Sequence, residues 1–157
     1  MATGWIHSYC YFSHMDSKEK TMSRTRLDEF REYRLRMNER IMSADHLGIK
    51  RFFNLDSAAY NDGALPGNVK ELLGLVASTV LRCNDCIDYH LIQCVEAGWS
   101  DEEITDALNV ALVVGGSIVI PHLRHAIETV DLLRQEAAAR GEGLGVRGEG
   151  IEVAGKE

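Results

Sequence analysis

The chain has 157 residues, of which 45% are hydrophobic, so it is long enough to bury one good core and too short to be expected to hold two. Its formal net charge is -7 and its sequence pI is about 5.4, and the acidic residues are spread along the chain without leaving a basic face. Nucleic acid and anionic membranes are therefore not expected to be partners.

The first 21 residues fit no regular period well, and we assign them as an N-terminal arm without a function. They do not have the pattern of an export signal, because no Lys or Arg stands near the start and His7, Ser8 and Ser13 interrupt the apolar residues. The later apolar runs LLGLVASTVL and ALVVGGSIVI are shorter than the roughly 20 residues that span a bilayer. We expect a cytoplasmic protein, and in that reducing compartment neighbouring cysteines are more often catalytic or metal-binding than structural.

Residues 22–137 are predicted to form one all-α domain. Between residues 23 and 42, hydrophobic side chains recur at three- and four-residue steps, which is typical of an amphipathic helix. Residues 54–68 break this pattern with Asn-Asp-Gly and Pro-Gly, and they are predicted to form a loop that leads into a new helix. Asn68 is placed to cap that helix, and Glu71 stands three residues later, in the capping-box position.

A further helix is predicted from near Cys83 to Ala97, with Gly98 as its stop. The next helix begins at Ser100, because Ser-Asp-Glu-Glu is a capping box with acidic residues in the first turn, where they suit the helix dipole.

The last long helix is predicted over about residues 117–135, with Pro121 in its first turn or at a kink. Residues 138–157 are rich in glycine and polar side chains and are predicted to form a disordered tail. The sequence shows no convincing strand pattern or repeat. The expected fold is therefore a single-domain, all-α bundle of about five to six helices.

The stretch LRCNDCIDYH brings Cys83, Cys86 and His90 within eight consecutive residues. A thiol is a nucleophile only as the thiolate. The pKa of a free cysteine is about 8.5, and it is lower at a helix N-terminus or within Cys-x-x-Cys. On a helix, His90 follows Cys86 by one turn and can accept or share its proton. One thiol can then attack a substrate while the other resolves the product as a disulfide, so the pattern predicts a redox site without a cofactor. Cys94 is expected in the core, and Cys10 is not interpreted.

Other interpretations of these residues stay open. A Cys-x-x-Cys can occur by chance in an apolar helix, with His90 as a hydrogen-bonded core residue. His122 and His125 have helical spacing and could join Cys83 and Cys86 in a Cys2His2 zinc site, although zinc-binding cysteine pairs usually lie on turns.

Residues 70–133 resemble the carboxymuconolactone decarboxylase superfamily, specifically its alkyl hydroperoxidase D-like branch. The resemblance rests on Glu71, on Cys83 twelve residues later, and on the segments CNDCIDYH, SDEEI and ALVVGGSIVIPH. Cys-x-x-Cys alone would be weak, but Glu-x11-Cys-x-x-Cys-x-x-x-His in an all-α chain is specific.

The resemblance implies an all-helical fold that assembles as trimers or hexamers and uses no metal, haem or other cofactor. In that branch the second cysteine, here Cys86, attacks the peroxide, and the first, here Cys83, is its disulfide partner. His90 and Glu71 correspond to members of the branch's proton relay. The implied electron donors are dihydrolipoyl groups or other dithiols.

The chain departs from the namesake of the branch, which has a histidine between the two cysteines, because Asn84 and Asp85 stand there. Repulsion from Asp85 tends to raise the pKa of the Cys86 thiol, so slow peroxidase activity is expected. Glu71 has two competing roles, since it can cap its own helix or point into the bundle toward His90.

We therefore expect a homo-oligomeric thiol peroxidase that reduces a hydroperoxide and is recycled by a dithiol. The first alternative is a dithiol–disulfide reductase or relay with little peroxide activity. Further alternatives are a non-catalytic oligomeric scaffold, a zinc-binding module and, most distantly, a lactone decarboxylase, since the decarboxylase branch generally lacks the paired cysteines.

Overall fold

The structure is a computed structural model, and we describe residues 24–141 of it. These residues form six α-helices, one short 3-10 helix and no strand, which confirms the predicted all-α, single-domain fold. The elements are α1 (Arg26–Met42), α2 (Leu47–Ala59), α3 (Gly67–Val80), α4 (Asn84–Glu96), α5 (Asp101–Gly115), η1 (Ser117–Val119) and α6 (Ile120–Ala139). No helix in this part of the chain is long and apolar enough to cross a membrane. The predicted arm and nearly all of the predicted tail lie outside the described residues.

Several helix boundaries follow from the local signals in the sequence. At α5, the Ser100 hydroxyl accepts from the Glu103 amide at 3.2 Å, and the Glu103 carboxylate accepts from the Ser100 amide at 2.8 Å, which confirms the capping box. Gly98 follows α4 with a φ of 83°, a left-handed conformation that favours glycine, and confirms the predicted stop. Pro121 lies in the first turn of α6, where its missing N–H breaks no helical hydrogen bond.

The loop prediction was wrong for residues 54–59, which belong to α2. The Asn-Asp-Gly segment does lie outside the helix, but the helix ends only at Tyr60, directly before this segment. No residue of α2 is buried, and Leu47, Phe52 and Leu55 are exposed, so packing against the core does not define the bounds of this helix. Its start is instead marked by His46, whose Nδ1 accepts from the Ile49 amide at 3.3 Å.

The capping role predicted for Asn68 was also wrong, because α3 already begins at Gly67. Pro66 occupies the cap position and offers no side-chain hydrogen bond. The free amide of Gly67 donates instead to Asp62 Oδ1 at 2.7 Å, from the loop before the helix. Glu71 is therefore not held by a capping box and can turn toward the interior of the bundle.

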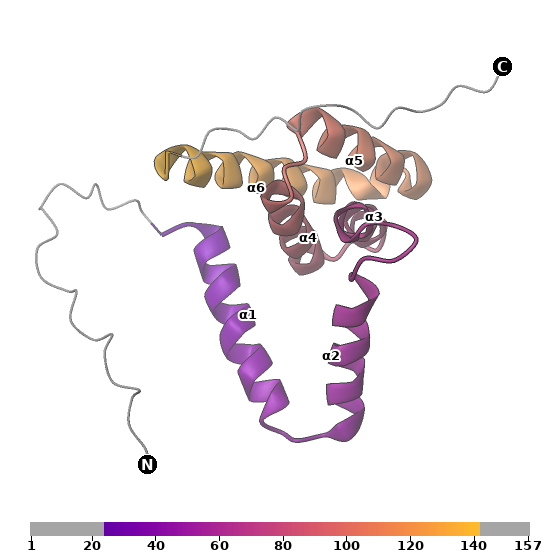
Figure 1. Cartoon of the computed structure of the whole chain (residues 1–157). Helices are drawn as coiled ribbons and strands as arrows, with labels where there is room; N and C mark the ends of the chain where they lie inside the picture. Colours follow the sequence, from indigo (N-terminus) through magenta and orange to yellow (C-terminus); the bar gives the residue numbers. More distant parts are fainter. Residues whose placement is uncertain (1–23, 142–157) are drawn as a thin grey trace, which may run out of the picture.

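Helices α3 to α6 pack together around the core, while α1 and α2 extend from them like the two arms of a V (Figure 1). The main core cluster consists of Leu27, Leu75, Ile87, Leu91, Cys94, Trp99, Ile104, Leu108, Ala126, Val130 and Leu133. Leu27 is the only buried residue of α1, and α2 has none. The two arms therefore serve as walls around a site more than as parts of the core.

A buried carboxylate joins the start of α1 to α4 and α6. The side chain of Asp88, on α4, is only 3% exposed. Arg26 Nη1 donates to its Oδ2 at 2.6 Å, and Thr129 Oγ1 donates to its Oδ1 at 2.6 Å. His125 Nε2 lies 2.9 Å from the same Oδ1. Because a buried carboxylate is costly unless it is paired and hydrogen-bonded, these contacts fix the three helices relative to one another.

A second ion pair holds α1 one turn further along. The guanidinium of Arg31 donates to the two carboxylate oxygens of Glu136, on α6, at 3.0 and 2.9 Å. This fork-like hydrogen bonding with Glu136 raises the pKa of Arg31. The base of α1 is thus anchored at two successive turns, and the rest of the helix projects away.

The Asp88 cluster gives a stability prediction. Asp88→Ala should lower the free energy of unfolding by about 3 kcal/mol, because Arg26 loses the buried charge that pairs with it. Urea unfolding, followed by circular dichroism, measures this loss. Asp85→Ala is the matched control, since it removes an exposed carboxylate from the same helix and should cost less than about 1 kcal/mol. Equal losses in the two variants would contradict a special role for the buried carboxylate.

Candidate active site

A tight corner places the first cysteine between two helices. Arg82 has a φ of 62°, in the left-handed region that costs a non-glycine residue about 1–2 kcal/mol. The amide of Arg82 donates to Thr79 O at 3.1 Å, and the amide of Cys83 donates to Ser78 O at 3.0 Å. This is the Schellman pattern that closes a helix, so α3 ends and α4 begins with only Leu81, Arg82 and Cys83 between them.

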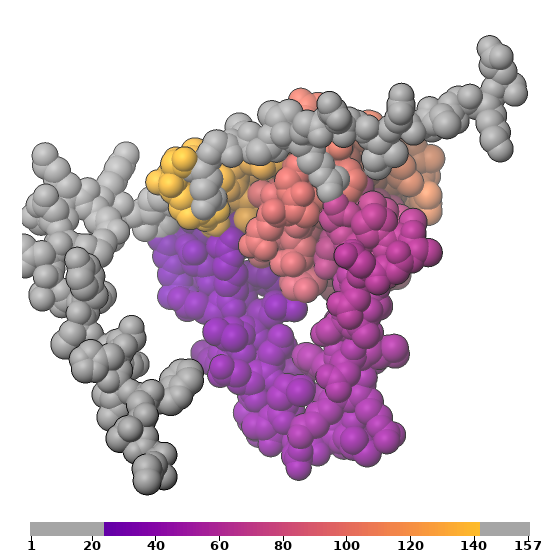
Figure 2. Space-filling model, in the orientation of Figure 1, coloured from indigo at the N-terminus to yellow at the C-terminus, as the bar shows by residue number. Residues whose placement is uncertain are grey.

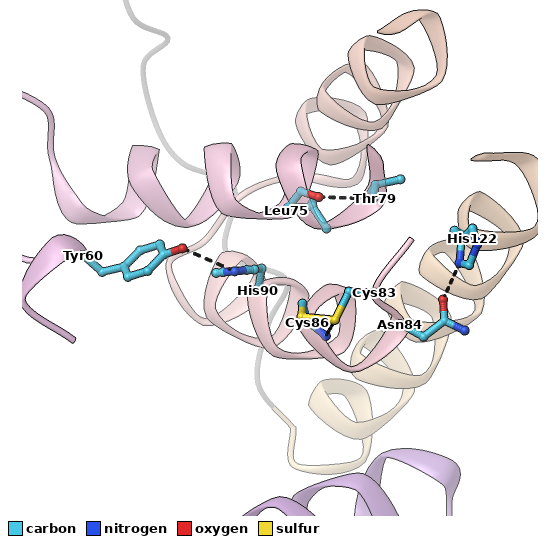
Figure 3. The surroundings of a disulfide bond; sticks show 8 residues. All are labelled: Tyr60, Leu75, Thr79, Cys83, Asn84, Cys86, His90 and His122. Carbon is cyan, nitrogen blue, oxygen red and sulfur yellow. Dashed lines mark hydrogen bonds between the residues drawn. A yellow bond between two sulfur atoms is a disulfide. The ribbon is translucent and has the colours of Figure 1, made fainter. Parts of the chain in front are cut away.

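The two motif cysteines form a disulfide in the first turn of α4. Cys83 is the N-cap residue, and its Sγ accepts from the Cys86 amide at 3.3 Å (Figure 3). Their Cα atoms are 5.2 Å apart, and both residues are half-buried. After reduction, both sulfurs lie at a helix N-terminus, where the positive end of the helix dipole favours a thiolate.

Glu71 and His90 form a hydrogen-bonded pair between α3 and α4. Oε2 of Glu71 lies 2.7 Å from Nδ1 of His90, and the two side chains are only 12% and 9% exposed. The structure thus brings Glu71 to the histidine, one of the two orientations expected from the sequence.

Gly74 makes room for this pair. It lies on the face of α3 that meets α4, and a Cβ atom built on it would stand 2.5 Å from Cε1 of His90 and 2.8 Å from both ring nitrogens. Such distances are far below van der Waals contact. The histidine ring therefore occupies space that any side chain at position 74 would fill.

Tyr60 is a third member of this site, and the sequence analysis missed it. Its hydroxyl lies 3.5 Å from Nε2 of His90, and the two ring centroids are 5.4 Å apart (Figure 3). Burial raises the pKa of Tyr60, with a further contribution from the nearby Glu71 carboxylate. The residue follows an unrecognised helix and is 30 positions from its partner, so no local spacing connects the two.

Cys86 and His90 line a cleft with a cavity volume of about 400 Å³ between the arms and α4. Figure 2 shows the molecule hollowed between α1 and α2. Aromatic rings from α1, from α4 and from the residue that ends α2 form much of the wall, namely those of Phe30, Tyr33, Tyr89 and Tyr60. Cys83 is not among the lining residues, so the cleft gives access to the second cysteine and not to the first.

Charged groups of both signs also reach the cleft. The guanidinium of Arg34 lies over the ring of Tyr89, 4.2 Å from its centroid, a cation–π contact between α1 and α4. The carboxylates of Asp56 and Asp85 belong to the same lining. Burial raises the pKa of Tyr89, and the Glu71 charge adds to this effect. Both tyrosines near His90 thus keep their protons at neutral pH.

The histidines considered for a zinc site have other partners. Nδ1 of His122 lies 2.7 Å from Oδ1 of Asn84, and His125 contacts the buried Asp88 (Figure 3 shows the first pair). Within residues 24–141, no three His, Cys, Asp or Glu side chains are grouped so that they could hold a metal ion. The four residues proposed for a zinc site are thus not assembled into one.

The third described cysteine is separate from this chemistry. Cys94 is fully buried in the core, as predicted, and burial raises the pKa of its thiol to about 12. It therefore stays protonated and unreactive at neutral pH. Cys10 lies outside the described residues.

Comparisons with known proteins show which family the chain matches. Residues 49–129 match the sequence model of the carboxymuconolactone decarboxylase family. Two crystal structures of TM1620 from Thermotoga maritima share 58% sequence identity with the chain. The first has a TM-score of 0.69, and the match covers 71% of this chain and 97% of that one. The second has a TM-score of 0.68, and the match covers 75% of this chain and 99% of that one.

More distant relatives were also found. An uncharacterized protein of Cupriavidus necator is 27% identical over 90 residues, which are 57% of this chain and 80% of that protein. The crystal structure of lpg0406, a carboxymuconolactone decarboxylase family protein of Legionella pneumophila, is 23% identical and has a TM-score of 0.62. The match covers 67% of this chain and 94% of that one, and at this identity it is evidence for the fold alone.

The space at Gly74 gives a test of the histidine's position. Gly74→Ala should displace the His90 ring and lower the free energy of unfolding by about 1–3 kcal/mol, despite the better helix propensity of alanine. Urea unfolding measures the loss, and the NMR shifts of the His90 ring protons report its displacement. Gly48→Ala is the control, because it makes the same change in another helix, where the added Cβ atom would meet only the capping His46 ring, at 3.1 Å. An unchanged His90 spectrum would refute the close packing.

Proposed function

The chain belongs to the carboxymuconolactone decarboxylase family, and from this premise we propose that it is a thiol peroxidase of the alkyl hydroperoxidase D-like type. One observation carries the proposal: the Cys83–Cys86 disulfide lies one helical turn from a buried His90–Glu71 pair, and Cys86 and His90 line a common cleft. The Thermotoga maritima protein TM1620 is itself described as a family member with a suggested part in an antioxidative response.

In the proposed reaction, the reduced Cys86 first loses its proton to His90. The thiolate attacks the distal oxygen of a hydroperoxide ROOH, the O–O bond breaks, and the leaving alkoxide takes up the proton as ROH. Cys86 is then a sulfenic acid. The Cys83 thiol attacks its sulfur, so that the disulfide forms and the hydroxyl leaves as water.

Glu71 supports the base in this scheme. Its carboxylate accepts from Nδ1 of His90, which leaves Nε2 as the nitrogen that takes the proton. When the imidazole becomes charged, the nearby carboxylate stabilises that charge, and because both side chains are nearly buried the pair interacts more strongly than in solution. This arrangement favours transfer of the proton from the thiol.

The disulfide is recycled by a dithiol donor, such as a dihydrolipoyl group. Because Cys86 and not Cys83 lines the cleft, the donor thiolate attacks the Cys86 sulfur and releases the Cys83 thiolate. The second donor thiol then breaks the mixed disulfide and releases Cys86. The donor leaves oxidised as a disulfide, and the enzyme carries both thiols again.

A dithiol–disulfide reductase is the rival that the same geometry supports. It would use the same cysteines on a small or protein disulfide, with little activity on peroxides. Asp85 and Cys86 line the same cleft, and the charge of Asp85 opposes formation of the Cys86 thiolate that either reaction needs, so slow reduction of peroxides is expected. The ratio of the rate with a hydroperoxide to the rate with a lipoyl disulfide separates the two activities.

Cysteine substitutions test the peroxidase directly. Cys86→Ser should abolish hydroperoxide consumption, whereas Cys83→Ser should reduce about one equivalent and then stop with Cys86 as a sulfenic acid. A peroxide assay with a dithiol donor measures the first result. The second is measured without a donor, whose thiols would reduce the sulfenic acid, by peroxide consumption and mass spectrometry of the product. Cys94→Ala is the control, since it removes a thiol outside the cleft and should retain turnover. Hydroperoxide consumption at the wild-type rate by Cys86→Ser would contradict the proposal.

We also propose that the protein is a homo-oligomer, either a trimer or a hexamer. Helices on opposite sides of the molecule expose large hydrophobic side chains, among them Leu35, Phe52, Leu55, Val110, Val113 and Val114. Val113 is 76% exposed and Val114 is 69% exposed. Apolar surface of this kind is typical of a protein that buries it against another copy.

Sedimentation equilibrium tests this assembly. The expected mass is about three or six times the 17.5 kDa of one chain. Val113→Glu should lower the mass, because it places a charge in an apolar interface. Thr105→Glu, at an exposed polar position of the same helix, should leave the mass unchanged. A monomeric wild-type protein would contradict the proposal.

A further inference from the structure

We propose that His122 is a positioning residue for Cys83 and that it acts through Asn84, the first residue of α4. Nδ1 of His122 lies 2.7 Å from Oδ1 of Asn84, and this contact joins α6 to the turn that carries both cysteines. This role rests on the proposed function in one respect, since it takes Cys86 as the attacking thiol and Cys83 as the thiol that closes the disulfide.

The contact is one end of a series of polar contacts between α4 and α6. Asn84 and Asp88 are one turn apart on α4, and their partners on α6 are His122, His125 and Thr129. These three partners recur at three- and four-residue steps, so they share the face of α6 that meets α4. Asp88 is the buried part of the series and fixes the body of the helix. Asn84 is the exposed end of the series and fixes the start of the helix.

The turn that carries the cysteines has no fully buried side chain. Cys83 and Cys86 are half-buried, Asn84 and Asp85 are exposed, and Ile87 is the first fully buried residue of α4. The disulfide is the covalent link across this turn, and a donor that reduces it removes that link. Because the ends of helices fray, hydrogen bonds must then keep the two sulfurs next to each other.

Cys83 is held from both of the neighbouring helices. Its amide donates to Ser78 O, at the end of α3, at 3.0 Å, which fixes the start of the turn. The contact between Asn84 and His122 fixes the next residue, and it does so from α6. Figure 3 shows Asn84 pointing from the turn to His122, on the side of the disulfide away from His90.

The two thiols therefore have different support. Cys86 lines the cleft and is one helical turn from His90, whereas Cys83 does not line the cleft. Cys83 is instead the N-cap residue of α4, and its sulfur accepts from the Cys86 amide at 3.3 Å. A donor at a helix N-terminus favours the thiolate, which is the form that attacks a sulfur. A first turn that stays folded thus keeps the Cys83 sulfur both reactive and close to Cys86.

The step that depends on this support is closure of the disulfide, and a small disulfide reagent isolates it. The Cys86 thiolate attacks dipyridyl disulfide, the S–S bond of the reagent breaks, and one thiopyridone leaves. The Cys83 thiolate then attacks the Cys86 sulfur, the second thiopyridone leaves, and the protein disulfide forms. The two thiols are oxidised and the reagent is reduced, and the protons of both thiols end on the two thiopyridone molecules.

The test is stopped-flow release of thiopyridone from the reduced, full-length protein with Cys10→Ser, which leaves Cys83, Cys86 and the buried Cys94. His122→Phe keeps a ring and removes the hydrogen-bond donor. The first release should keep its wild-type rate, whereas the second should slow about fivefold, the order of effect of one hydrogen bond. Mass spectrometry after the first release should find the label on Cys86. The closed protein carries no label, which separates closure from a second labelling.

Three further variants separate the contact from other effects of the substitution. His122→Asn places an amide N–H where Nδ1 of the imidazole stands, so it should restore the second release to near its wild-type rate. Asn84→Ala should slow this release as His122→Phe does, and the double variant should be no slower, because the two side chains act as one unit. Arg124→Gln removes a charge from an exposed position of the same helix and should leave both rates unchanged.

Three results would overturn the role of His122. They are a wild-type second release in His122→Phe, an equal slowing of both releases, and full additivity in the double variant. A first label on Cys83 would also overturn it, because Cys83 would then be the attacking thiol.

These outcomes are distinct from those of the peroxidase test, because the reagent is a disulfide and no hydroperoxide is needed. A protein that consumes no peroxide but closes its disulfide more slowly in His122→Phe would refute the proposed function and retain the role of His122. A protein that consumes peroxide while His122→Phe closes at the wild-type rate would give the opposite result.

Discussion

The hydrogen bond between Glu71 and His90 is the contact on which the site depends. It joins α3 to α4 in a nearly closed space, and it decides which ring nitrogen faces the cleft. The glycine one turn after the glutamate is the condition for it, since any side chain there would occupy the volume of the imidazole. The packing of two helices and the protonation chemistry of the site are therefore set by the same few atoms.

The cleft also depends on a second buried polar cluster. Asp88 lies on the same helix as the cysteines and holds Arg26 at the base of α1, so one helix carries both the reacting thiol and the attachment of the wall opposite it. α1 contributes Leu27 alone to the core. Its position therefore relies on directional charge pairs more than on hydrophobic contact, which fits a part of the molecule that encloses a site.

Most of the fold and the Cys-x-x-Cys-x-x-x-His segment could be predicted from the sequence because their signals are local, whereas the role of Glu71, 19 positions from His90, was implied only by the family resemblance. The capping box at Ser100 and the Cys-x-x-Cys spacing lie within one or two turns of helix. The same kind of reasoning failed for Asn68, because the short-range pattern was real but α3 had already begun at Gly67. Tyr60 and Asp88 were missed for a different reason: their contacts join residues 30 or more positions apart, and no local spacing connects such residues.

The corner between α3 and α4 has a consequence for how the site can vary. Cys83 serves both helices, since its amide closes α3 and its sulfur caps α4. The connection between α3 and α4 therefore cannot lose a residue without losing one of these hydrogen bonds. An insertion or deletion there would rotate α4 by about 100° about its axis and carry His90 away from Glu71. Variation can change Asp85, between the cysteines, but the length of this connection is as much a part of the active site as the thiols themselves.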